Sequence, residues 1–169
     1  KRRRKRQDWT TNPCGEIILR PRGLCNLSEV VIRADDTLET LMEKVKVATM
    51  IGTIQSGLTN FKFLNDLHPD WEKNATEERL LGVSLTGQMD NPEILTEDNL
   101  QSLRDYAIGV NVETAGRLNI NRSAAITTTK PSGTASLLVN SASGFHPRFS
   151  DYYIRRVRVG KNETIYTYL

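Results

Sequence analysis

A strand-like run leads directly into a helical one over residues 26–58, which read NLSEVVIRADDTLETLMEKVKVATMIGTIQSGL. Residues 26–33 are rich in β-branched side chains, which favours a strand. The rest places apolar residues at the 3.6-residue period of a helix, at Leu38, Leu41, Met42, Val45, Ala48, Ile51, Ile54 and Leu58. Asp36 and Glu39 are predicted to form a capping box at the start of this helix.

Further strands and helices are predicted on both sides of this unit. Residues 80–86 (LLGVSLT) form a short apolar run ended by Gly87, as a buried strand does, and Thr96 is placed to cap a helix that ends near Leu118. Shorter β-like runs cover residues 15–20, 124–129 and 152–159, whereas residues 59–78 show no period and predict a loop. The mixture predicts an α/β fold with too few strands to close a barrel.

The composition is that of a soluble globular domain. The 169 residues are 38% hydrophobic and 25% charged. No apolar run approaches the roughly 20 residues of a membrane helix, and no signal peptide is recognisable. We therefore expect a cytoplasmic protein that makes no contact with a membrane.

A basic run, KRRRKR, occupies residues 1–6, and without it the net charge of +3 becomes −3. Such a run can bind nucleic acid. It has no interleaved aromatic residues of the kind that stack on bases, so a solvated segment is the preferred interpretation. The predicted organisation is a basic segment at 1–6 and a body at 7–169, and we do not expect nucleic acid among the partners.

The pentapeptide Asn12-Pro13-Cys14-Gly15-Glu16 carries the most specific chemistry in the chain. In an extended backbone, Asn12, Cys14 and Glu16 project to one side, because strand side chains alternate. A carboxylate near a thiol disfavours the thiolate, so the pattern favours a thiol that loses a hydrogen atom. An ordinary buried thiol is the alternative. No metal site is predicted, because two cysteines and two histidines show no zinc-type spacing.

The NPCGE motif, followed by CNLSEV from Cys25, resembles the finger loop of the ribonucleotide reductases. The separation of eleven residues between the two cysteines is similar to that in the adenosylcobalamin-dependent class. The resemblance implies that Cys14 becomes a thiyl radical and removes the 3′ hydrogen of the ribose, that Glu16 takes the proton of the 3′ hydroxyl, and that Asn12 binds the ribose hydroxyls. It also implies that Cys25 is one half of the cysteine pair that delivers the reducing electrons.

Residues 130–136 (KPSGTAS) form a glycine-containing turn, whose backbone N–H groups can hold a phosphate. In the resembled family a similar loop holds the substrate phosphates, which implies five binding candidates: Ser132, Gly133, Thr134, Ala135 and Ser136. Residues 143–148 (SGFHPR) and 152–158 (YYIRRVR) are also similar to this family. Arg155, Arg156 and Arg158 either line an anionic channel or alternate on a half-exposed strand, and the strand is the preferred interpretation.

The resemblance implies part of a ten-stranded α/β barrel, namely its second half with the finger loop, which is incomplete alone. We therefore expect a companion chain or segment with the rest of the barrel, adenosylcobalamin as cofactor, a ribonucleotide as substrate and a thioredoxin-like reductant. CNLSEV favours the triphosphate reductases. Two alternatives stay open: a segment of an anaerobic glycyl-radical reductase, and a nonenzymatic, basic-armed nucleic-acid-binding module.

Overall fold

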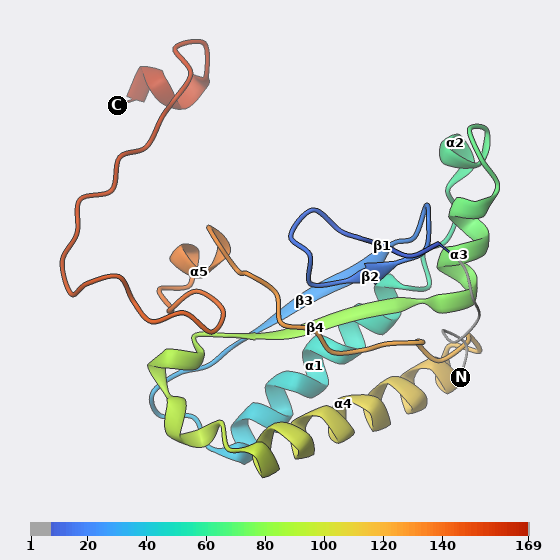
Figure 1. The fold of residues 1–169 in the computed structure, drawn as a ribbon, viewed down its shortest axis with the longest axis horizontal. Helices are drawn as coiled ribbons and strands as arrows, with labels where there is room; N and C mark the ends of the chain where they lie inside the picture. Colours follow the sequence, from blue (N-terminus) through green and yellow to red (C-terminus); the bar gives the residue numbers. More distant parts are fainter. Residues whose placement is uncertain (1–7, 169) are drawn as a thin grey trace.

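Two parallel strands form the centre of the structure. In the computed structural model, which describes residues 8–168, β3 (Cys25–Val31) pairs with β4 (Leu80–Thr86), with Cys25 opposite Leu80. The connection between the strands contains α1 (Leu38–Gln55), and α4 (Glu97–Arg117) follows β4. Both helices cover the same face of the sheet (Figure 1). A parallel pair needs such a crossover connection, so the predicted strand, helix and strand are confirmed, as is the helix capped by Thr96.

Apolar side chains from the two strands fill the space under the two helices. The larger of them each stabilise the fold by about 1.5–3 kcal/mol through burial. The cluster consists of Val30, Ile32, Leu41, Val45, Ala48, Leu81, Val83, Leu103 and Ala107.

The second half of α1 contacts α4 through polar side chains. Ile51 and Ile54 are 56% and 53% exposed, whereas Thr49 and Thr53 are fully buried. Asn111 Nδ2 on α4 donates a hydrogen bond to Thr53 Oγ1 at 2.9 Å, and Thr53 Oγ1 donates to the Thr49 carbonyl at 2.7 Å. Because Asn111 and Thr53 form these buried hydrogen bonds, the predicted apolar stripe turns away from the core after Ala48.

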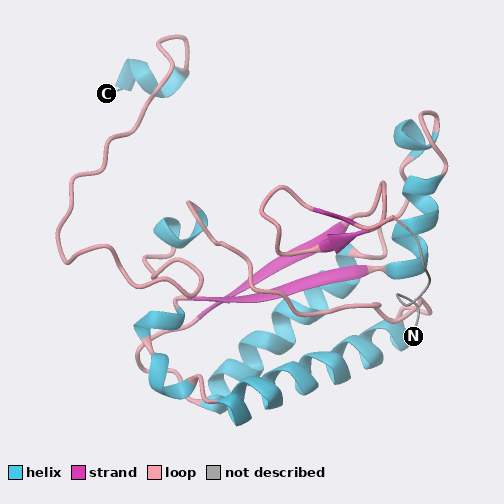
Figure 2. Cartoon of the chain, in the orientation of Figure 1, coloured by secondary structure: helices cyan, strands magenta, loops and turns pink. Residues whose placement is uncertain are grey.

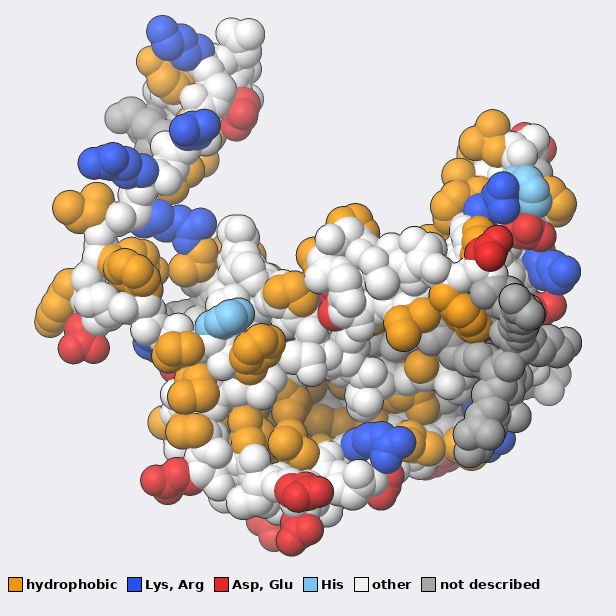
Figure 3. Space-filling view, in the orientation of Figure 1, with side chains coloured by type: hydrophobic (Ala, Val, Ile, Leu, Met, Phe, Trp, Pro, Cys, Tyr) orange, Lys and Arg blue, Asp and Glu red, His pale blue; other side chains and the backbone are white. Residues whose placement is uncertain are grey.

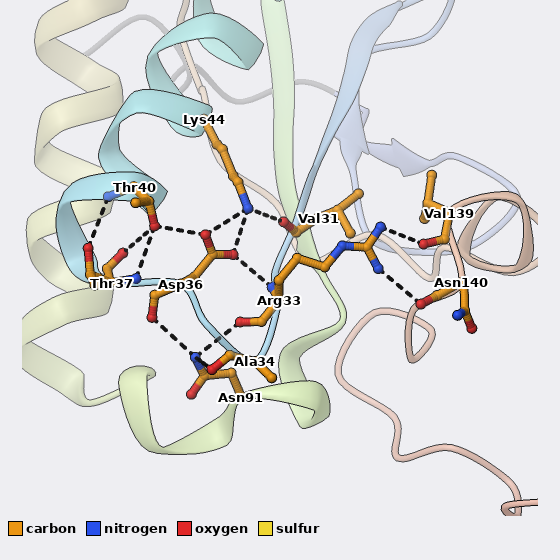
Figure 4. Close-up of polar contacts among 10 residues, drawn as sticks. All are labelled: Val31, Arg33, Ala34, Asp36, Thr37, Thr40, Lys44, Asn91, Val139 and Asn140. Carbon is orange, nitrogen blue, oxygen red and sulfur yellow. Dashed lines mark hydrogen bonds and ion pairs between the residues drawn. The ribbon is translucent and has the colours of Figure 1, made fainter.

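The N-terminus of α1 is capped by Thr37 and Thr40, so the predicted capping box of Asp36 and Glu39 is wrong. The Asp36 carboxylate instead joins the end of β3 to the helix (Figure 4). It accepts hydrogen bonds from the Arg33 N–H at 2.7 Å, from Thr40 Oγ1 at 2.7 Å and from Lys44 Nζ at 2.6 Å. Burial raises the pKa of Asp36, but these hydrogen bonds outweigh burial, and the pKa lies below the ordinary value of an aspartate.

This network predicts a pH-dependent contribution to stability. Because the pKa of Asp36 is lower in the folded state, its contribution is present above the unfolded value of about 3.9 and is lost as the pH falls through the folded value. We expect Asp36→Asn to lower the free energy of unfolding by about 1–3 kcal/mol at pH 7, and by much less at pH 2. Urea denaturation at the two pH values, with the exposed Asp35→Asn as control, measures this difference; an equal loss at both would contradict it.

A short hairpin lies on the face of the sheet opposite the helices (Figure 2). Its strands are β1 (Thr10–Thr11) and β2 (Ile18–Leu19), and they pair in antiparallel orientation. Cys14 lies in this hairpin, whereas Cys25 begins β3. The turn at residues 20–23 is present, with Gly23 N–H bonded to the Arg20 carbonyl at 2.8 Å, but the strand after it pairs with the long, buried β4 rather than with β2.

Residues 59–78, predicted as a loop, contain two helices, α2 (Lys62–Asn65) and α3 (Asp70–Glu78). In α3 the only large apolar residue is Trp71, so periodicity could not reveal the helix. Its ends do carry signals. Pro69 precedes it, Asp70 and Glu72 lie in its first turn, and Arg79 ends it in the left-handed conformation.

The C-terminal third contains few regular elements. Residues 124–129 run beside β4 with a single bridge, from Val83 to Thr127, and α5 (Ala135–Leu138) has one turn. The predicted strand at 152–159 is wrong, because among the described residues no strand edge pairs with it. Short 3-10 helices cover Gln88–Asp90, Pro92–Ile94 and Thr164–Tyr168.

None of the helices within residues 8–168 has both the length and the apolar character to cross a membrane. The basic run at 1–6 lies outside the described residues.

Candidate functional site

The tip of the β1–β2 hairpin is a tight turn. The Gly15 N–H donates to the Asn12 carbonyl at 3.0 Å, and Gly15 has a φ of +80°. Asn12 also closes the loop from inside, because its Oδ1 accepts a hydrogen bond from the Ile17 N–H at 3.0 Å. The condition of an extended backbone, under which the three side chains would project to one side, is not met here. Asparagine, proline and glycine at the first, second and fourth positions favour a β-turn instead.

The turn places the three predicted catalytic side chains in different surroundings. Cys14 is exposed to solvent. Glu16 is half-buried, and its Oε2 is a buried oxygen that accepts no hydrogen bond from any described residue. Asn12 uses its oxygen within the hairpin, while its Nδ2 has no partner within residues 8–168. Buried polar atoms in native proteins are nearly always bonded, so the free Glu16 oxygen near an exposed thiol is a candidate acceptor for a ligand proton.

Cys25 and Thr128 both lie beside Gly82 of β4. Thr128 Oγ1 donates a hydrogen bond to the Glu16 carbonyl at 3.1 Å. A Cβ atom at Gly82 would lie 3.1 Å from Thr128 Cγ2 and 3.3 Å from Cys25 Sγ. The missing side chain at Gly82 therefore leaves room for both groups, and Cys25, Thr128 and the Glu16 backbone meet at this point of β4. Neither cysteine forms a disulfide in this structure.

Lys130 fixes the start of the predicted phosphate loop to the sheet. Its N–H donates to Ser84 Oγ at 2.8 Å, and its Nζ lies 3.3 Å from Glu29 Oε2 on β3. Ser132 follows Thr128 by four residues, so its Cα lies within about 14 Å of the Thr128 Cα. The loop and the cysteine hairpin are therefore held to neighbouring parts of the same sheet.

The five predicted phosphate-binding residues form a compact turn before and within α5. Ser132 and Ser136 are buried; Ser136 Oγ donates to the Gly133 carbonyl at 2.6 Å, whereas Ser132 Oγ has no partner among the described residues. Gly133 and Thr134 are exposed, and Ala135 is half-buried. Gly133 has a φ of +55°, and its N–H donates to Ser143 Oγ at 3.0 Å. One of the backbone donors that could hold a phosphate is therefore already used.

Asp90, which follows β4, holds the segment after the phosphate loop in place through Ala142 and Arg148. It accepts hydrogen bonds from the Ala142 N–H at 2.8 Å and from Arg148 Nε at 2.9 Å. Burial raises the pKa of Asp90, but these bonds outweigh burial and keep the pKa below its ordinary value. Arg33 adds hydrogen bonds to the carbonyls of Val139 and Asn140 at 2.6 and 3.0 Å.

Three of these positioning residues, Gly82, Thr128 and Asp90, are not among the predicted site residues. Gly82 does carry a signal in the sequence, because a glycine inside a strand often marks a close approach by another group. Thr128 and Asp90 carried no such signal, because their partners lie 112 and 52 residues away in the chain.

No protein-family model matches the chain. Curated proteins do match it. The sequence is 30% identical over 162 residues to the "Probable adenosylcobalamin-dependent ribonucleoside-triphosphate reductase" of Dictyostelium discoideum; the alignment covers 91% of this chain and 20% of that protein. It is 27% identical over 190 residues to the adenosylcobalamin-dependent ribonucleoside-triphosphate reductase of Lactobacillus gasseri, and that alignment covers 92% of this chain and 24% of the relative. The Euglena gracilis enzyme of the same name is 27% identical over 164 residues, which cover 91% of this chain and 21% of the relative.

The fold also has a solved counterpart. The structure is similar to the crystal structure of a B-12 dependent (class II) ribonucleotide reductase, with a TM-score of 0.54, at 21% sequence identity, over 80% of this chain and 22% of that chain. The α/β fold predicted as part of a reductase barrel is confirmed, and so is the resemblance to the adenosylcobalamin-dependent class. The chain spans about a fifth to a quarter of the length of these proteins.

Proposed function

We propose that this chain is the segment of an adenosylcobalamin-dependent ribonucleotide reductase that carries the radical cysteine, its general base and the substrate-phosphate loop. The similarity to the Dictyostelium reductase over 91% of the chain carries the proposal. The names of the three relatives above specify ribonucleoside triphosphates, so we take a triphosphate as the substrate. The activity belongs to the complete protein, to which a companion chain or segment contributes the remaining length.

Cys14 supplies the reactive sulfur. When bound, adenosylcobalamin supplies the radical chemistry that removes the hydrogen atom of the Cys14 thiol. The exposed position of Cys14 at a turn fits this role, because the thiol is open to a cofactor held against the hairpin tip by the assembled enzyme. The Cys14 sulfur then takes the 3′ hydrogen atom of the ribose, so that an S–H bond forms as the C3′–H bond breaks.

Glu16 and Asn12 act on the ribose hydroxyls. The buried Glu16 Oε2, which lacks a partner within the described chain, accepts the proton of the 3′ hydroxyl. Asn12 Nδ2 donates a hydrogen bond to a ribose hydroxyl, while its oxygen keeps the hairpin closed. The amide orients the sugar without titrating.

Cys25 supplies half of the reducing electrons. The cysteine pair consists of Cys25 and a second cysteine outside this chain. It supplies two electrons and two protons and ends as a disulfide: one proton leaves with the 2′ hydroxyl as water, and the other ends on C2′. The Cys14 thiol then returns its hydrogen atom to C3′. A thioredoxin-like reductant then restores the two thiols. The cytoplasm suits this cycle, because protein thiols are kept reduced there, and the product is a deoxyribonucleotide for DNA replication.

The 132–136 loop holds the phosphates. Ser132 Oγ is a buried hydroxyl without a partner among the described residues, and Thr134 and Gly133 are exposed at the turn. We assign the phosphate nearest the ribose to these groups.

Glu16→Gln tests the base. A glutamine keeps the size of the side chain but cannot accept the proton, so we expect the turnover number to fall about 10²–10⁴-fold, with little change in KM. Deoxynucleotide formation by the assembled enzyme measures the effect, with Glu39→Gln on the exposed face of α1 as the matched control. Normal turnover by Glu16→Gln would exclude Glu16 as the base.

A further inference from the structure

A large hollow lies beside the predicted phosphate loop. It measures about 1280 Å³, is open to solvent, and is lined by residues of the loop, by residues that follow the loop up to 143, and by residues 147–156. Ordinary ligand pockets measure roughly 300–1,000 Å³, so the hollow has room for a nucleotide. Gly133 and Ser136 line it from the loop.

Arginine side chains line the same hollow. Arg148, Arg155 and Arg156 contribute to its wall, and Asp151 is the one carboxylate among the residues that line it. Figure 3 shows basic side chains spaced along the C-terminal segment, which runs from orange to red in Figure 1. The hollow therefore favours an anionic ligand.

Two of these arginines are available to a ligand. Arg148 donates hydrogen bonds to Asp90 and Asn140. Arg155 and Arg156, in contrast, are exposed and form no ion pair or hydrogen bond with any residue in the described part of the chain. Arg158 does not line the hollow. Because residues 152–159 form no strand, the preferred interpretation from the sequence, a strand on which the three arginines alternate, is wrong.

A buried hydroxyl in the wall of the hollow also lacks a partner. Ser141 lines the hollow and is 7% exposed, yet its Oγ forms no hydrogen bond with the residues at 8–168. A buried hydroxyl without a partner costs about 1–3 kcal/mol. This observation is independent of the arginines, and it leaves a polar group with unused hydrogen-bonding capacity in a residue that lines the hollow.

We propose that Arg155 and Arg156 bind the two outer phosphates of a ribonucleoside triphosphate whose inner phosphate lies at the 132–136 loop. Guanidinium groups form paired hydrogen bonds with phosphate oxygens, and two arginines match two phosphates. The inference rests on the proposed function and extends it, because it assigns the preference for a triphosphate over a diphosphate to these two side chains.

Binding of inorganic tripolyphosphate to the full chain tests the proposal without any need for turnover. By isothermal titration calorimetry, we expect the double variant Arg155→Ala/Arg156→Ala to raise the Kd at least about tenfold. Arg158→Ala, which removes one positive charge outside the hollow, should change the Kd by less than about threefold, the effect of a solvent-screened charge. The Kd of Arg155→Lys/Arg156→Lys should lie between these two values, because lysine keeps the positive charge but cannot form the paired hydrogen bonds of a guanidinium group.

Two results would overturn the proposal: no binding of tripolyphosphate by the unmodified chain, or an equal loss in Arg158→Ala. Circular dichroism of each variant checks that its fold is retained. Failure of the proposed reductase function would give a different combination of results in the binding and activity measurements. If tripolyphosphate binds through Arg155 and Arg156 but the assembled protein reduces no nucleotide, the reductase assignment alone fails. If the protein reduces nucleotides and the double variant leaves the KM for the triphosphate unchanged, the arginine assignment alone fails.

Discussion

Cys14→Ala is expected to abolish deoxynucleotide formation by the assembled enzyme and to leave its fold intact. The proposed reaction begins with a sulfur-centred radical at this position, and alanine has no hydrogen atom that is weakly bound enough to replace the thiol hydrogen. We expect the rate to fall to background, a loss of at least about 10⁴-fold on the scale of enzymatic rate enhancements. Product formation from a labelled ribonucleoside triphosphate is the measurement.

Stability provides the control for this variant. Cys14 is exposed at the tip of a turn, and surface substitutions of this kind change the free energy of unfolding by less than about 0.5 kcal/mol. Thr11→Ala, on the exposed strand β1 of the same hairpin, should keep its activity. Substantial turnover by Cys14→Ala would remove this cysteine from the mechanism.

Cys25→Ser is expected to stop sustained turnover when a thioredoxin-like protein or a dithiol is the reductant. A serine oxygen cannot form the disulfide that carries the two electrons away from the substrate, so the steady-state rate should fall to background. Cys25 is half-buried beside Gly82 and Thr128, and the smaller polar group should cost about 1 kcal/mol of stability.

Thr128→Ser is the matched control for Cys25→Ser. It keeps the hydroxyl that donates to the Glu16 carbonyl and removes only the methyl group near the Cys25 sulfur. If packing around Cys25 were the important feature, both variants would lose activity. If the redox role holds, Thr128→Ser keeps most of its turnover; unchanged steady-state activity in Cys25→Ser would refute that role.

The central layer of the fold could be predicted from the sequence, because its elements carry strong local patterns. The apolar run at residues 80–86 and the Thr96 cap each indicate one structure, and both are present. The end of α1 was predicted less well. Thr53 is buried where Asn111, 58 residues away in the chain, donates a hydrogen bond to it, and no local pattern contains that information.

The candidate site was predicted as a set of residues rather than as a geometry. The motif identifies Asn12, Cys14 and Glu16 as candidate residues. It does not predict the turn that positions them, because the three side chains were placed on an extended backbone, although the proline and glycine favour a turn. The strand predicted at residues 152–159 is absent for another reason. An alternating pattern becomes a strand only where a neighbouring edge pairs with it, and within the described residues none does.

The most direct test of the central claim is reconstitution of deoxynucleotide formation. The chain would be combined with a polypeptide carrying the remaining length of a reductase such as the Dictyostelium relative, together with adenosylcobalamin, a ribonucleoside triphosphate and a dithiol. We predict deoxynucleotide formation that requires every component and disappears with Cys14→Ala. Formation that persists with Cys14→Ala, or a correctly assembled complex that forms no deoxynucleotide, would contradict the account.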